Sequence, residues 1–154
     1  MLEVRFSSRV FTSGFDISTP LGGFSTKGAP DFPIGEILVL DHAGNQVARL
    51  GLESFLSSVY NIIITGGGFY QFGRDGNSKR TWTCKGEERL LCLSERNWRK
   101  FFISEGTQEI AEFSKAWYTS DYAVSVSNDA DLKLVICIII ALNESENPGS
   151  TAPM

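Results

Sequence analysis

The sequence is poor in the residues that build metal and redox sites. It contains one histidine, His42, and three cysteines among 154 residues. Cys84, Cys92 and Cys137 stand at spacings that match no metal-binding cluster. Because zinc and other transition metals are held mainly by clustered Cys and His side chains, we expect no metal site and no cofactor. Cys137 lies in an apolar run, where cysteine behaves as a small hydrophobic residue, and we expect all three thiols to be reduced.

We also expect no membrane-spanning segment and no secretory signal in this sequence. The apolar run from Leu134 to Leu142 holds nine residues. As a helix it would be ~14 Å long at about 1.5 Å per residue, whereas a bilayer core is ~30 Å thick and needs about 20 residues. The first ten residues carry Glu3, Arg5 and Arg9 and lack the apolar core of a signal peptide. We therefore expect a cytoplasmic protein that is not transmembrane.

The chain has no general excess of positive charge. Its net charge is −4, which argues against nucleic acid as the main partner, because phosphate contacts depend on Lys and Arg. The charge is unevenly distributed, since the segment from Arg74 to Lys100 holds eight basic residues against four acidic ones. This segment is the candidate for contact with an anionic partner.

Composition and pattern predict one β-rich domain. Hydrophobic residues make up 42% of the chain and charged residues 21%, which is typical of a globular protein. We expect a single domain over 1–145 and a disordered tail over 146–154. Short alternating apolar and polar runs, separated by turns that contain glycine, predict successive β-hairpins. The clearest is Ile37–Leu40 with Gln46–Leu50 across the turn Asp41–Asn45.

The same pattern recurs along most of the chain. Further strands are predicted at Phe15–Ile17, Phe24–Lys27, Tyr60–Ile64, Phe69–Phe72, Arg80–Cys84, Leu90–Leu93, Trp98–Ile103, Glu109–Phe113 and Tyr122–Val126. Ten or more short strands without interspersed helices indicate a barrel or a sandwich.

The apolar run near the C-terminus is predicted to be a helix. Its β-branched residues favour a strand on propensity alone. However, Asn128, Asp129 and Asp131 precede the run and offer an N-cap with negative charge at the positive end of the helix dipole, and Asn143 stands where a C-cap would. A helix that is apolar on every side must be enclosed by the rest of the fold.

These segments, in this order, resemble the LURP-one-related and scramblase-like branch of the tubby C-terminal-like superfamily over about residues 10 to 144. The matching residues are Phe15–Ile17 with Gly22–Gly23 and Lys27–Gly28, Ile37–Asp41 with Gly44 and Val47–Ala48, Ser58–Ile62, Glu109–Ala111, Tyr122–Val124, and Asp131–Leu142. The resemblance implies a mainly β fold, a closed antiparallel barrel of about twelve strands that encloses a C-terminal apolar α-helix. Members of the superfamily are linked to phosphoinositide-dependent membrane tethering, lipid scrambling and plant defence, so the resemblance implies no single activity.

Three local signals have simple structural interpretations. His42 lies in a turn without a nucleophile beside it, which favours a solvated turn over catalysis. Gly66–Gly68 follows a strand as a phosphate-binding loop would, but a strand follows it, which favours a simple turn. Asn128, Asp129 and Asp131 lack the six to eight oxygen ligands that calcium prefers, which favours helix capping. We therefore expect no enzyme activity.

Two functional hypotheses remain. The first is a non-catalytic module that attaches peripherally to anionic phospholipid or phosphoinositide headgroups, with Arg74, Lys79, Arg80, Lys85 and Arg89 as the binding residues. Glu87, Glu88 and Glu95 interleave with these cations, which is also the pattern of an ordinary solvated surface.

The second hypothesis is a protein-interaction or scaffold domain that presents loops or a patch with Trp82, Trp98 and Trp117 to an unknown protein. A third interpretation, lipid transport by a membrane-inserted C-terminal helix, conflicts with the nine-residue length of the apolar run.

Overall fold

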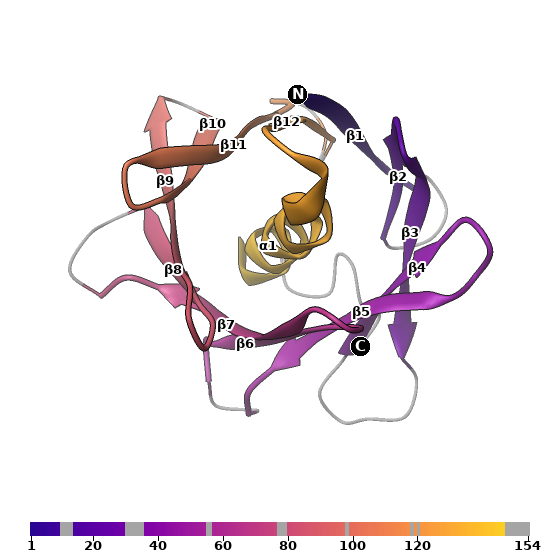
Figure 1. Ribbon diagram of the computed structural model, residues 1–154, viewed down its shortest axis with the longest axis horizontal. Helices are drawn as coiled ribbons and strands as arrows, with labels where there is room; N and C mark the ends of the chain where they lie inside the picture. Colours follow the sequence, from indigo (N-terminus) through magenta and orange to yellow (C-terminus); the bar gives the residue numbers. More distant parts are fainter. Residues whose placement is uncertain are drawn as a thin grey trace.

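Twelve antiparallel strands form a closed barrel around one helix in the computed structural model (Figure 1). The structure describes residues 1–9, 14–29, 36–54, 57–76, 80–97, 99–117, 119 and 121–146. The strands are β1 (Leu2–Ser8), β2 (Phe15–Thr19), β3 (Gly22–Ala29), β4 (Glu36–Asp41), β5 (Gln46–Leu52), β6 (Tyr60–Ile64), β7 (Gly68–Arg74), β8 (Thr81–Lys85), β9 (Leu90–Asn97), β10 (Lys100–Glu105), β11 (Gln108–Lys115) and β12 (Tyr122–Val126). Each strand pairs with its neighbours in sequence, and β1 closes the barrel between β12 and β2. The expected fold class is confirmed.

Alternation along the strands separates the inner from the outer face of the wall. In β6, Tyr60, Ile62 and Ile64 are buried while Ile63 is exposed, and β12 buries Tyr122, Val124 and Val126 in the same way. Successive side chains of a strand point to opposite faces, so each strand contributes an apolar stripe to the interior. The barrel interior is therefore lined with apolar side chains on all sides.

The helix α1 (Leu132–Glu146) fills this interior (Figure 1). A 3₁₀ turn, η1 (Asp129–Asp131), precedes it, and the Asn128 side chain accepts a hydrogen bond of 3.0 Å from the backbone N–H of Asp131. The predicted N-cap is thus confirmed. Every residue from Leu134 to Glu144 is buried, as an all-round apolar helix requires.

The C-terminal part of the prediction is wrong in two details. Asn143 is not a C-cap, because α1 continues to Glu146, and residue 146 therefore belongs to the helix and not to a tail. The Asn143 side chain accepts a hydrogen bond of 3.2 Å from the hydroxyl of Tyr122, so the barrel wall gives it a partner inside the helix. Burial, with a contribution from Glu144, raises the pKa of Tyr60 to about 12 in the same region. Residues 147–154 lie outside the described residues.

The N-terminal strand β1 was not predicted. Its alternation of Leu2, Val4 and Phe6 with polar residues is the ordinary signal of a half-buried strand. Val4 and Phe6 are buried, and the Phe6 ring packs edge-on against Phe15 and Tyr122, 5.6 and 5.9 Å between centroids. β1 therefore completes the apolar lining of the barrel between β12 and β2.

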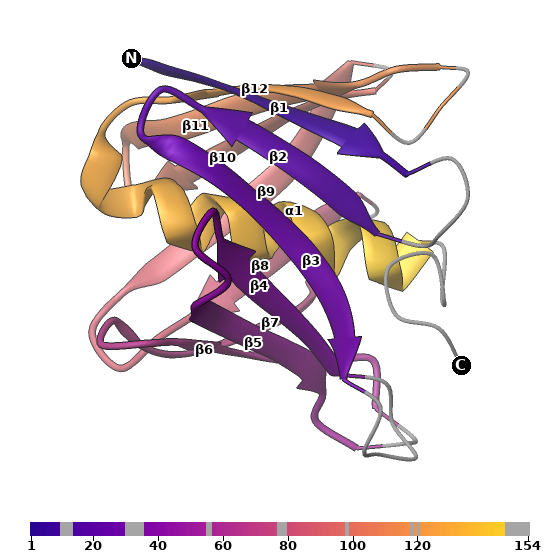
Figure 2. The same cartoon turned by 90° about the vertical axis from the view of Figure 1, so that its right-hand side faces the viewer.

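Because the strands alternate in direction, their connections fall at two opposite ends of the barrel (Figure 2). We call the end where α1 begins the proximal end. It holds the β4–β5, β6–β7, β8–β9 and β10–β11 turns, on the left in Figure 2. We call the end where α1 finishes the distal end, and it holds the β7–β8, β9–β10 and β11–β12 connections. Neither α1 nor any other helical segment within the described residues combines the length and apolar character that crossing a bilayer requires.

Candidate functional site: a basic and aromatic rim

The predicted headgroup-binding residues do not form one site. Arg74 and Arg80 lie at the distal end, where β8 begins. Lys85 and Arg89 lie at the proximal end, where β8 finishes. β8 has five residues and spans ~17 Å at about 3.3 Å per residue. Lys79 lies outside the described residues.

Arg89 fastens the start of the helix to the barrel wall. Its Nε and Nη2 donate to the two carboxylate oxygens of Glu105 at 2.9 and 2.8 Å, and its Nη1 donates to Asp131 at 2.9 Å. These bonds raise the pKa of Arg89 and lower the pKa of Glu105. Lys85 is exposed nearby. Because Arg89 is already engaged by two carboxylates, it has little positive charge to offer to another anion.

Arg80 connects the end of α1 to the barrel wall in a similar way. Its Nε and Nη2 donate to Glu95 at 3.0 and 2.9 Å, and its Nη1 donates to Glu146. The hydrogen bonds to Glu95 and Glu146 raise the pKa of Arg80. The backbone of Arg80 takes a φ of 61°, a left-handed conformation that is uncommon for a residue with a side chain. Arg80 is thus committed to an internal network of ion pairs.

Arg74 and Arg80 flank the buried indole of Trp82. Their guanidinium carbons lie 5.4 and 5.0 Å from the ring centroid, within the range of cation–π contacts. A cavity of about 290 Å³ beside them is lined by Arg74, Trp82 and Glu146, among others. Glu146 and the negative end of the helix dipole both make this cavity unfavourable for an anion.

A second group of cations at the distal end is not neutralised in this way. Arg96 and Lys100 are exposed and stand over the ring of Phe102, with the guanidinium carbon at 4.2 Å and Nζ at 5.9 Å from the centroid. Lys115 Nζ stands 6.0 Å from the centroid of Tyr122. Among the residues that the structure describes, none of these three cations pairs with a carboxylate. Arg96 and Lys100 present their positive charge to solvent, and Lys115 is half-buried.

An exposed tryptophan adjoins these cations. Trp117 is 69% exposed and follows β11 directly. Arg99 ties its loop to the β9–β10 connection, since Arg99 Nη1 donates to the carbonyl of Ala116 at 2.8 Å and the Arg99 carbonyl accepts from the Lys115 N–H at 3.0 Å. We call Arg96, Lys100, Lys115 and Trp117 the basic rim.

Only part of the basic rim lies in the segment that the sequence marks as basic. Arg96 and Lys100 lie in the basic segment, but Lys115 and Trp117 lie beyond the β10–β11 hairpin. The pairing of Lys100 with Ser114 brings the two groups together, and the predicted hairpin contained that signal. Of the three tryptophans named in the rival hypothesis, Trp82 is buried at 3% exposure and Trp117 is exposed, while Trp98 lies outside the described residues.

The remaining candidate residues take structural roles. His42 is exposed in a turn where Asp41 accepts hydrogen bonds from the backbone N–H groups of Ala43 and Asn45, both at 2.9 Å. Gly66 and Gly68 have φ angles of 72° and 106° in the β6–β7 turn, which glycine adopts without strain. Both turns agree with the predictions. Within the described ranges no three His, Cys, Asp or Glu side chains group as metal ligands would.

Comparison with known proteins supports the fold. No protein-family model matches the sequence, and no curated protein matches it. Among solved structures, an X-ray structure of a protein from Arabidopsis thaliana is similar, with a TM-score of 0.61 and 13% sequence identity over 92% of this chain and 90% of that chain. At this identity the likeness concerns the fold alone.

Proposed function

We propose that this chain is a non-catalytic binding module of the LURP-one-related type, a cytoplasmic protein that attaches peripherally to anionic phospholipid or phosphoinositide headgroups. The family assignment is supported by the order of the matching segments together with the closed twelve-stranded barrel around α1. The basic rim at the distal end is the proposed contact surface.

The observation that carries this proposal is the exposure of cations without carboxylate partners beside an exposed tryptophan. Juxtamembrane basic residues contribute about 1 kcal/mol each at an anionic surface, so Arg96, Lys100 and Lys115 together supply ~3 kcal/mol. Tryptophan prefers the membrane–water interface, where its ring is apolar and its N–H stays hydrated. Trp117 therefore adds an anchor that does not depend on salt.

The proposed surface differs from the one expected from sequence. Arg80 and Arg89 would have to leave Glu95, Glu146, Glu105 or Asp131 to bind a headgroup, and breaking such pairs leaves a partly buried carboxylate uncompensated. Arg74 is exposed at the distal end and can add to the attraction of the basic rim. Lys85 faces the opposite end.

Binding through so few charges is weak and sensitive to salt. An interaction of ~3 kcal/mol alone corresponds to a dissociation constant above about 1 mM. Exposed charges are largely screened beyond about 8 Å at physiological ionic strength. We therefore expect attachment mainly to membranes dense in anionic lipid.

Vesicle co-sedimentation tests the proposal. We expect the protein to sediment with phosphatidylserine or phosphoinositide vesicles at low salt, less at moderate salt, and not with neutral phosphatidylcholine vesicles. Arg96→Glu/Lys100→Glu should abolish sedimentation because it reverses two rim charges.

The matched control is Lys85→Glu/Lys133→Glu, which reverses two exposed charges at the proximal end and should leave sedimentation nearly unchanged. Failure of the unmodified protein to sediment with any anionic vesicle at low salt would contradict the proposal. Equal loss in both double variants would show that net charge, and not the basic rim, decides binding.

A protein-interaction role is the second candidate function. It is favoured by a cleft at the proximal end, whose lining includes the exposed carboxylates of Glu87 and Glu88.

A further inference from the structure

A cleft lies at the proximal end, between the start of β7 and the β8–β9 turn. It has a volume of about 510 Å³, and its lining includes Phe69, Tyr70, Lys85, Glu87, Glu88 and Arg89. Pairing between β7 and β8 stops at Gln71 with Lys85, although β7 begins at Gly68. The first residues of β7 therefore extend past the end of β8, and the gap between them is the cleft.

The floor of the cleft is closely packed. The ring of Tyr70 lies against Gly86, where an added Cβ would stand 2.5 Å from the ring. Gly86 thus lets the β8–β9 turn approach Tyr70 without a clash. Tyr70 is itself buried, so its ring forms an apolar floor for the cleft.

One exposed apolar side chain, Phe69, lines the cleft, and Ile63 and Leu90 lie on the strands next to it. Phe69 and its cross-strand partner Ile63 are 50% and 48% exposed. Leu90, the partner of Lys85 on β9, is 52% exposed. Grouped exposure of large apolar side chains around a concave site is typical of a surface that is covered in a complex.

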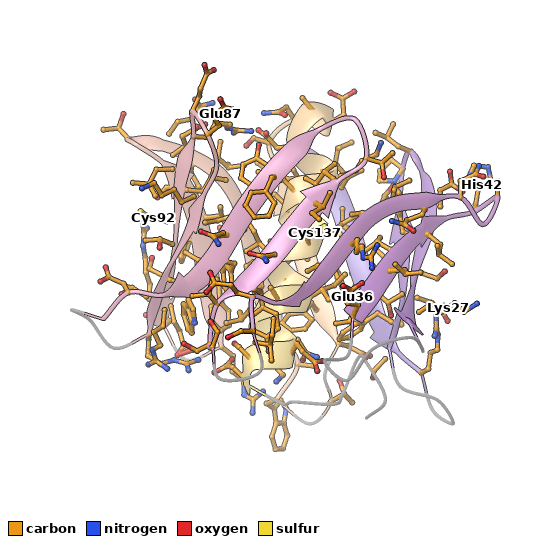
Figure 3. All side chains as sticks on the ribbon, turned by 90° about the horizontal axis from the view of Figure 1, so that it is seen from below. Lys27, Glu36, His42, Glu87, Cys92 and Cys137 are labelled. Carbon is orange, nitrogen blue, oxygen red and sulfur yellow. The ribbon has the colours of Figure 1, made fainter. Side chains whose placement is uncertain are left out.

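The charges of the cleft lining leave a small negative balance, because two carboxylates stand against one cation whose charge is not offset. Glu87 and Glu88 lie on the β8–β9 turn, and Glu87 projects away from the wall at the upper end of the barrel in Figure 3. The charge of Arg89 is offset by Glu105 and Asp131, which leaves Lys85 as the remaining cation of the lining. This balance opposes an anionic ligand and favours a cationic one.

We propose that this proximal cleft docks a segment of a partner protein that carries an aromatic or aliphatic anchor next to Lys or Arg. The anchor would pack between Phe69 and Leu90 over Tyr70, and the cation would reach Glu87 and Glu88 while stacking on the exposed Phe69 ring. The cleft lies at the opposite end from the basic rim, so this proposal does not depend on membrane binding.

Two tripeptide probes of opposite charge test the proposal. Acetyl-Arg-Phe-Arg-amide and acetyl-Glu-Phe-Glu-amide are titrated into the ¹⁵N-labelled protein, and amide chemical shifts are followed. We expect the cationic peptide to shift the amides of 68–71 and 86–89, with at least a tenfold weaker response to the acidic peptide. The variant Glu87→Lys/Glu88→Lys should reverse this preference, and Phe69→Ser should weaken binding of both peptides.

Glu109→Lys/Glu112→Lys, on β11, is the matched control and should keep the preference for the cationic peptide. Well-dispersed amide spectra establish that each variant is folded. The proposal is overturned by absence of shifts up to about 10 mM peptide, a concentration at which even binding of ~3 kcal/mol is visible. It is also overturned by equal responses to both peptides, or by shifts that map away from the cleft.

Discussion

At the scale of single residues, burial decides which side chains can react. Burial raises the pKa of the Cys84 thiol to about 12 and raises the pKa of the Cys137 thiol further in the same direction. Both cysteines belong to the core, whereas Cys92 is exposed on the outer face of β9. The thiolate is the reactive form of cysteine, so the two buried residues are poor nucleophiles at neutral pH.

Thiol alkylation at neutral pH should therefore distinguish Cys92 from the other two cysteines. We expect iodoacetamide to modify one thiol in the native protein and all three in denaturant, as counted by intact mass. Cys92→Ser should show no modification in the native state. Rapid modification of two or three thiols under native conditions would contradict the packing of α1 against β8.

Two of the predicted headgroup-binding residues, Arg80 and Arg89, form ion pairs with residues that are distant in the chain. The local clustering of cations predicts that Arg80 and Arg89 are available to a headgroup. In the structure Arg89 and Arg80 are bound by Asp131 and Glu146, which lie 42 and 66 residues away in the chain. No local pattern reveals such pairs, because they depend on where α1 begins and ends inside the barrel.

At the scale of elements, the predictions that rest on periodicity are confirmed. The hairpin of β4 and β5 and the cap at Asn128, which begins the 3₁₀ turn before α1, were both visible in sequence, since turn glycines and capping side chains act within a few residues. The end of α1 was not visible in the sequence, because the buried side chain of Asn143 accepts a hydrogen bond from Tyr122, a residue on the barrel wall. Propensity near a helix end is easily overridden by such tertiary contacts.

The ion pair at the start of the helix makes a specific contribution to stability. The Arg89 guanidinium lowers the pKa of Glu105 from its ordinary 4.5. A lowered folded-state pKa stabilises the fold at pH values above 4.5, and this stabilisation is lost as pH falls through the folded-state pKa. Arg89→Met would also leave Asp131, a buried carboxylate, without its partner.

We expect Arg89→Met to reduce the free energy of unfolding by about 1–3 kcal/mol at pH 7. The reduction should shrink at pH 3, because Glu105 takes up a proton in the unfolded chain and in the variant, whereas its lowered pKa keeps more of it ionised in the folded normal protein. Urea unfolding at both pH values measures the difference. Lys85→Met, which removes an exposed cation nearby, should change stability little at either pH, and an equal pH-dependent loss there would argue against a role for the ion pair.

At the scale of the whole molecule, the barrel has two chemically different ends. The distal end carries the basic rim with Trp117, and the proximal end carries an acidic cleft bordered by exposed apolar side chains. The helix α1 is fastened at both ends by Arg89 and Arg80, which holds the two surfaces in a fixed relation. The two proposals therefore place the membrane and the protein partner at opposite ends of the barrel.

The most direct test of membrane attachment through the basic rim is quenching of tryptophan fluorescence by vesicles of anionic phospholipids with brominated acyl chains. Trp82 is buried in the protein, so quenching by the bilayer should come from tryptophan on the rim. We predict strong quenching at low salt that is reversed by added salt and lost in Trp117→Phe. Quenching that persists unchanged in Trp117→Phe, or its absence while the protein sediments with the same vesicles, would show that the membrane is contacted by another surface.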